Sequence, residues 1–131
     1  MRKLTLIGIA AAVAAVFALV PAALAGGSKD GDGVIKRGRC SASSTWKLKA
    51  KPDDGRIEAE FEVDQNAVGK RWRVTLVRNG AVVFSGVRRT IAPSGSFEVR
   101  RRLADSAGAD RILARARALA GGETCRAALS L

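Results

Sequence analysis

The sequence predicts an all-β protein in which two antiparallel sheets pack face to face as a sandwich. Three observations support this fold class. Apolar and charged residues alternate with period two over several segments, Asp-Gly, Asn-Gly and similar turn residues separate these segments, and two cysteines lie near the ends of the alternating region. Alternation of this kind places one face of each strand in a core and the other in water.

The first 25 residues have the features of a secretion signal. Arg2 and Lys3 precede a long uncharged apolar run, and Ala23-Leu24-Ala25 matches the pattern that signal peptidase recognises. Cleavage between Ala25 and Gly26 is expected, and retention of this segment as a membrane anchor is the alternative. The protein is therefore expected to be secreted or attached to the cell envelope, with two fewer positive charges than the +11 of the whole chain.

Residues 26–38 (GGSKDGDGVIKRG) are rich in Gly and charge, which favours a flexible tether ahead of one domain over residues 39–131. A domain of this size buries a small core and gains from a covalent link. Cys40 and Cys125 are the only cysteines, and export to an oxidising compartment favours a disulfide between them. In the chain-entropy model this bond contributes roughly 4–5 kcal/mol. Two buried free thiols are the alternative.

The clearest strands are residues 46–51 and 57–64, which flank a turn at Asp54-Gly55. With the turn at this place, Lys47, Lys49 and Lys51 face the acidic residues of the second arm, while apolar residues face one another on the other side. The matched pairs are Lys47 with Glu62, Lys49 with Glu60, Lys51 with Glu58, Trp46 with Val63, Leu48 with Phe61, and Ala50 with Ala59. The register is therefore predicted pair by pair.

A second hairpin is predicted around Asn79-Gly80, which is a strong signal for a two-residue turn. Its first arm, residues 71–78, alternates Trp72, Val74 and Leu76 with polar residues. Its second arm, residues 81–88, is apolar on both faces, so the pattern specifies its register less well.

Residues 96–103, 110–118 and 124–131 complete a set of seven strands. The segment 110–120 is rich in Ala, Leu and Arg, so a short helix is the alternative there. A strand is preferred because Gly121-Gly122 then turns the chain into the strand of Cys125. Seven short strands favour a sandwich of immunoglobulin or fibronectin-III type, closed here by one disulfide. In that arrangement the strand at 57–64 also pairs with the strand at 96–103.

The side chains that most enzymes use are scarce. The chain has no His and no Tyr, and a disulfide leaves no free thiolate. We therefore expect neither catalysis, nor a metal site, nor a cofactor. Glu58, Glu60, Glu62 and Asp64 share one face, but the lysines opposite them indicate a solvated charge ladder rather than an acid–base pair.

The surplus positive charge is expected on one sheet. The strands at 71–78, 81–88, 111–118 and 124–131 contain many arginines and no Asp or Glu. The candidate site is a face that would bind an anionic partner, either a cell-wall polymer, a lipid headgroup or an acidic protein. Its residues are Arg71, Arg73, Arg88, Arg115 and Arg117. Sequence-specific nucleic-acid binding is not expected, because no exposed aromatic residue accompanies them.

The second functional hypothesis is an inhibitor or accessory protein that caps another secreted protein through a loop, either 65–70 or 104–110. The stretches CSASSTWKLKAKPDDGRIEAEFEVD, GKRWRVTLVRNGAVV, APSGSFEVRR and GGETCRAALSL also resemble a family of small secreted actinobacterial proteins. The resemblance implies an exported domain of immunoglobulin-like or fibronectin-III-like fold. It implies no catalytic or binding residues.

Overall fold

The computed structural model describes residues 33–131, all of them in strands or in the loops that join them. The signal segment, its cleavage at Ala25 and Gly26, its alternative as an anchor, and the tether up to residue 32 lie outside the described residues. Within the described part, no helix is long and apolar enough to cross a membrane. The strands are β1 (Val34–Arg39), β2 (Thr45–Asp53), β3 (Arg56–Asp64), β4 (Arg71–Arg78), β5 (Ala81–Arg89), β6 (Ser96–Ala104), β7 (Arg111–Ala118) and β8 (Thr124–Ser130).

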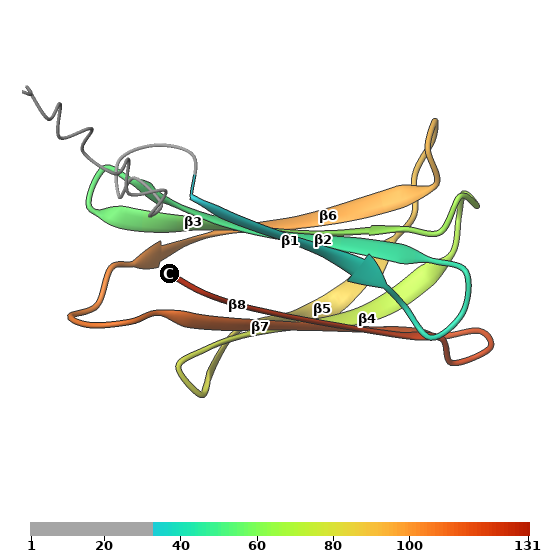
Figure 1. Ribbon diagram of the computed structural model, residues 1–131. Helices are drawn as coiled ribbons and strands as arrows, with labels where there is room; N and C mark the ends of the chain where they lie inside the picture. The colour runs from blue at the N-terminus through green and yellow to red at the C-terminus, as the bar shows by residue number, and fades with distance from the viewer. Residues whose placement is uncertain (1–32) are drawn as a thin grey trace, which may run out of the picture.

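The strands form two four-stranded antiparallel sheets that face each other (Figure 1). The order is β1-β2-β3-β6 in the first sheet and β5-β4-β7-β8 in the second. The predicted sandwich is confirmed, as is the predicted pairing of the strand at 57–64 with the strand at 96–103. The alternative of a helix over 110–120 is wrong, because residues 111–118 form β7 between β4 and β8.

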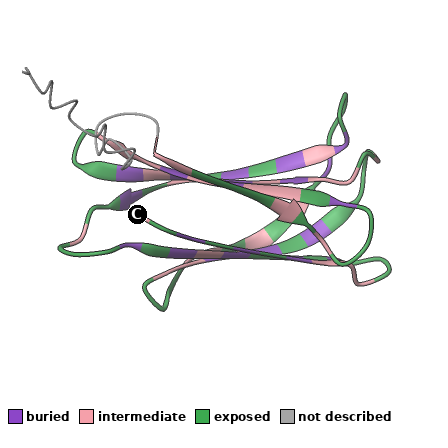
Figure 2. Ribbon diagram, viewed as in Figure 1, coloured by how far each residue is buried: buried purple, intermediate pink, exposed green. Residues whose placement is uncertain are grey.

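The core lies between the sheets and is built by the alternation seen in the sequence (Figure 2). In β3, and in β4 up to Leu76, every second residue is fully buried, as Phe61 and Trp72 illustrate. β7 and β8 contribute mainly small residues, and Ala114, Ala116 and Ala127 are buried there. Across the sheets Trp72 packs against Phe97, with ring centroids 6.1 Å apart, while the small residues of β7 and β8 let the two layers pack closely.

Both predicted turns and the first register are confirmed. Asp54 and Gly55 have positive φ angles of 52° and 73°, and Asn79 and Gly80 have 48° and 84°, as a type I′ turn requires. All six residue pairs predicted between β2 and β3 occur in the structure. Matching of apolar with apolar and of Lys with Glu was therefore sufficient to specify this hairpin.

The structure adds an eighth strand within the segment interpreted as a tether. β1 pairs with β2 from Val34 to Arg39, so the folded domain begins before residue 39. A Cβ atom on Gly38 would lie 2.5 Å from the ring of Trp46, so this glycine allows close contact of backbone and indole. The sequence pattern concealed β1 because an edge strand exposes most of its residues, here several charged ones.

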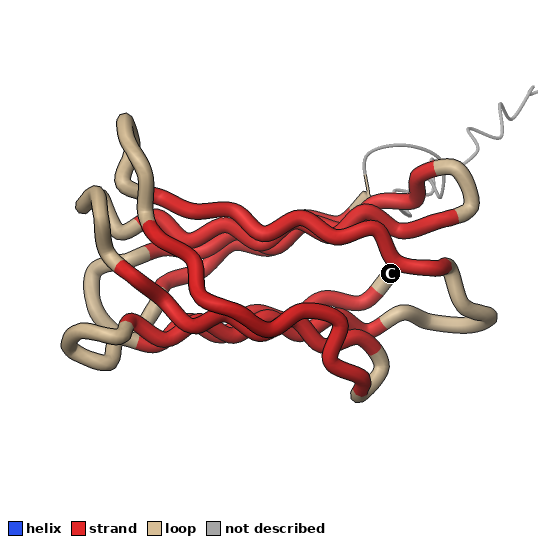
Figure 3. Tube along the Cα trace, turned by 180° about the vertical axis from the view of Figure 1, so that it is seen from behind, coloured by secondary structure: helices blue, strands red, loops and turns tan. Residues whose placement is uncertain are grey.

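The two ends of the sandwich differ in what they carry. Gly33 and the C-terminus lie at one end, together with the β2–β3 and β4–β5 turns and the loop before β7 (Figures 1 and 3). The other end holds the four remaining loops, at 40–44, 65–70, 90–95 and 119–123. We call these the terminal end and the loop end.

Candidate functional site

The outer face of the β5-β4-β7-β8 sheet gathers exposed arginines from all four strands. Four of the five predicted residues are on it: Arg71 and Arg73 from β4, and Arg115 and Arg117 from β7. Arg89 from β5 and Arg126 from β8 also point outward there. These two were not among the predicted residues, although Arg126 lies in a strand whose alternation places it outward. Arg111, at the terminal end of β7, is exposed on the same side of the sheet but lies outside this group. We call the other six arginines the basic face.

Arg88, the fifth predicted residue, is not on the basic face. A β-bulge between Leu76 and Val77 of β4 and the facing part of β5 shifts the pairing by one residue, which places Arg88 opposite buried Trp72. Its guanidinium lies 4.7 Å from the ring centroid of Phe84, and that of Arg101 lies 4.5 Å from the same ring. Arg88 therefore closes the β5–β6 side of the sandwich by cation–π contact, and Arg89 takes the outward position next to Arg71.

The centre of the basic face is a shallow hollow. Arg73 lies directly opposite Arg117, and Arg115 lies directly opposite Arg126. Two threonines extend these pairs, since Thr75 faces Arg115 and Thr124 faces Arg117. All six of these side chains line the hollow, together with Ala116 and Cys125, whose own side chains point into the core.

No carboxylate neutralises this hollow within the part of the chain that the structure describes. The four strands of the sheet contain no Asp or Glu, and both acidic residues that flank them are engaged elsewhere. Asp110 is buried and accepts hydrogen bonds from Arg78 Nε at 3.0 Å and Ser106 Oγ at 2.7 Å. Glu123 binds the loop at 40–44. The arginines of the hollow thus produce an uncompensated positive field.

On the opposite sheet, two arginines of β6 lie beside carboxylates. Arg100 of β6 lies within salt-bridge distance of Glu58, Glu60 and Glu98, and Arg102 lies 3.4 Å from Asp53. The negative charges around it, that of Glu60 foremost, raise the pKa of the Arg100 guanidinium above its usual value. The predicted charge ladder is therefore present in its register, but its closest ion pairs use the arginines of β6 rather than the lysines of β2. An arginine presents several donors and can contact more than one carboxylate.

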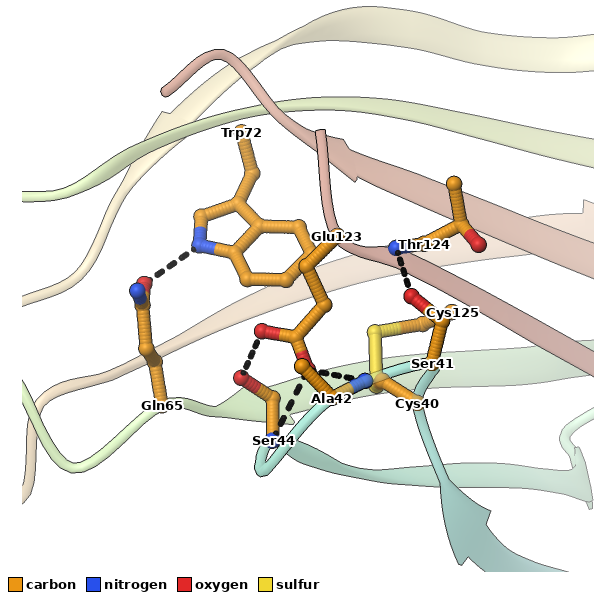
Figure 4. Close-up of a disulfide and its surroundings, with 9 residues drawn as sticks. All are labelled: Cys40, Ser41, Ala42, Ser44, Gln65, Trp72, Glu123, Thr124 and Cys125. Carbon is orange, nitrogen blue, oxygen red and sulfur yellow. Dashed lines mark hydrogen bonds between the residues drawn. A yellow bond between two sulfur atoms is a disulfide. The ribbon is translucent and has the colours of Figure 1, made fainter. Parts of the chain in front are cut away.

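The Cys40–Cys125 disulfide holds β8 against the first sheet at the loop end (Figure 4). Its Cα atoms are 4.3 Å apart. Beside it, the Glu123 carboxylate accepts hydrogen bonds from the backbone N–H of Ala42 and Ser44 and from the Ser44 hydroxyl, at 3.0, 2.9 and 2.7 Å. The predicted disulfide is therefore confirmed, and together with these hydrogen bonds it fixes the strand that carries Thr124 and Arg126.

The loops considered for capping another protein lie at opposite ends of the molecule. The loop at 65–70 is at the loop end, where its backbone bonds to Thr90 and Gly95, whereas residues 104–110 are at the terminal end. They do not form one surface. Val68, Ile91 and Leu119 are exposed apolar residues of neighbouring loops around the first of them.

Among the described residues, no group of three His, Cys, Asp or Glu side chains is placed to hold a metal ion. Comparison of the chain with protein-family models, curated proteins and solved structures gives no match.

Proposed function

We propose that the protein is a secreted or envelope-associated, non-catalytic binding module that holds an anionic partner on its basic face. The observation that carries the proposal is the hollow of Arg73, Arg115, Arg117 and Arg126, which lies on a sheet without a single carboxylate. Guanidinium groups suit phosphate, sulfate and carboxylate because they donate two parallel hydrogen bonds.

The contrast between the two sheets supports a specific role for the charge. If the excess of basic residues reflected composition alone, arginines on both sheets would have similar surroundings. Arg100 instead has three carboxylates within 4.0 Å, whereas the arginines of the hollow face one another. The disulfide and the N-terminal signal pattern favour an oxidising, extracytoplasmic location for the module.

Retention on phosphocellulose at increasing salt tests the proposal. The variant R73Q/R115Q is compared with K47Q/K49Q, which removes the same charge from the other sheet. Each phosphate contact that is lost should lower the slope of log affinity against log salt by about one. We expect this slope to fall by about two for R73Q/R115Q and to change little for K47Q/K49Q. Equal elution of the two variants would show that net charge alone determines retention, and would refute a specific face.

A second candidate function is the capping of another protein by the loop end. Val68 and Ile91 are 55% and 62% exposed, and both belong to loops that hydrogen bonds hold in place. Capture from culture filtrate with the wild-type protein and with V68D/I91D separates the candidates. A stoichiometric protein partner that only V68D/I91D loses would favour capping, whereas loss by R73Q/R115Q would favour the basic face.

A further inference from the structure

The hollow contains a repeated arrangement of side chains. One row across the strands is Arg73, Arg117 and Thr124, and the next row is Thr75, Arg115 and Arg126. Each row therefore has two adjacent arginines and one threonine, although the order of the residues differs. Directly opposed residues have Cβ atoms about 5 Å apart, so the two guanidiniums of one row can reach a single oxyanion.

The spacing between the rows is set by the strand. Arg115 and Arg117 are two residues apart in β7, and a strand rises about 3.3 Å per residue. Equivalent points of the two rows are therefore about 7 Å apart. One tetrahedral oxyanion is too small to use both rows fully, whereas two linked oxyanions at this spacing match them.

The arrangement is unfavourable in the free protein. Like charges directly opposite each other on neighbouring strands are destabilising, and this happens in both rows and again between Arg71 and Arg89. On the other sheet, Arg37 faces Lys47 and Glu62 faces Glu98, but Lys47 and Glu62 also face each other, so opposite charges lie next to the like ones. A bound anion in each row would convert the repulsion into attraction.

We infer that the basic face binds a linear phosphodiester polymer, with successive phosphates in successive rows. This inference rests on the proposed function and specifies its ligand. Phosphates joined through a three-carbon alditol extend over a distance comparable to the spacing of the rows. The polymer lacks bases, because the described strands of this sheet offer no aromatic ring on the outer face on which a base could stack: Trp72 is fully buried, and Phe84 lies opposite buried Leu76.

Calorimetric titration of the protein with glycerol 3-phosphate and with its phosphodiester-linked dimer and tetramer tests the inference. The dimer should bind at least tenfold more tightly per phosphate than glycerol 3-phosphate, because its second phosphate binds intramolecularly. Variants R73Q/R117Q and R115Q/R126Q should each reduce the dimer to the affinity of the single phosphate. The matched control K47Q/K49Q should stay within twofold of wild type. Removal of repulsion should leave the urea midpoint of both row variants unchanged or higher.

The outcomes separate the inference from the proposed function. Equal affinity per phosphate for monomer and dimer would overturn the two-row site even if R73Q/R115Q still elutes early from phosphocellulose. If R73Q/R117Q and R115Q/R126Q behave like K47Q/K49Q both in the calorimetric titration and on phosphocellulose, the basic face itself is refuted. Phosphatidylglycerol vesicles test the other source of the same chemistry, since binding to vesicles without preference for the dimer would overturn the polymer as ligand.

Discussion

The hydrogen bonds of Glu123 allow a quantitative prediction about what holds the loop end together. Its carboxylate accepts two backbone N–H groups and one hydroxyl, and Ser44, which supplies two of the three donors, is only 1% exposed. In E123A the buried donors of Ser44 lose their acceptor, at a cost of about 1–3 kcal/mol for each unsatisfied group. The Ala42 N–H is exposed and can bond to water. We therefore expect E123A to lower the free energy of unfolding by about 3 kcal/mol.

The isosteric variant E123Q should cost much less. An amide oxygen in the place of Oε2 still accepts both backbone N–H groups, and the amide NH₂ can donate to the Ser44 hydroxyl, which rotates to accept. All three bonds are then retained without a charge. Charge-assisted bonds are about twice as strong as neutral ones, so a loss of about 1 kcal/mol is expected.

Equilibrium unfolding in urea, with the disulfide intact, measures both values. The only two tryptophans, Trp46 and Trp72, lie in β2 and β4 and report the transition by fluorescence. E98A is the matched control, because Glu98 bonds to exposed Arg100 and should matter by less than about 0.5 kcal/mol. A loss below about 0.5 kcal/mol for E123A, or equal losses for E123A and E123Q, would refute the assigned role of the carboxylate.

Three further predictions concern the scaffold and the charge. Reduction of the disulfide, which links residues 85 apart, should lower the free energy of unfolding by about 4–5 kcal/mol in urea titrations. D110A leaves the guanidinium of Arg78, 15% exposed, without its partner, and should cost about 3 kcal/mol or more, measured in the same way. Retention on a sulfonate resin should be constant between about pH 6 and 9 at fixed salt, because neither arginine nor the sulfonate titrates in this range; a fall in retention within it would contradict the arginine assignment.

The sequence was sufficient for the central strands because two independent patterns agreed there. In β2 and β3 the apolar pairs and the Lys–Glu pairs require the same register, so one error would have disturbed both. The grouping of four acid-free strands into one sheet was likewise predicted and is confirmed. What the sequence could not show was the β-bulge opposite Leu76 and Val77. A strand that is apolar on both faces carries no mark of an inserted residue, so the prediction placed Arg88, not Arg89, on the basic face.

The missed strand β1 has a related cause. Apolar and polar residues hardly alternate in β1, because it is an edge strand and most of its side chains face water on both sides. Gly38 was interpreted as a sign of flexibility, whereas the structure uses it for close contact with Trp46. A glycine in a charged segment is compatible with both meanings, and only the partner strand distinguishes them.

The position of the disulfide connects the scaffold to the proposed site. β8 is an edge strand, held on one side only by β7, and one of its pairs with β7 is the like-charged pair Arg115 and Arg126. Repulsion in that row acts to separate β8 from the sheet. Cys125 lies next to Arg126 and ties β8 to Cys40, which directly follows β1 of the other sheet, while the carboxylate of Glu123 binds Ala42 and Ser44 in the loop after Cys40. The link between the sheets therefore stabilises the strand that the basic face would otherwise weaken, and the free protein can keep its arginines adjacent before any anion arrives.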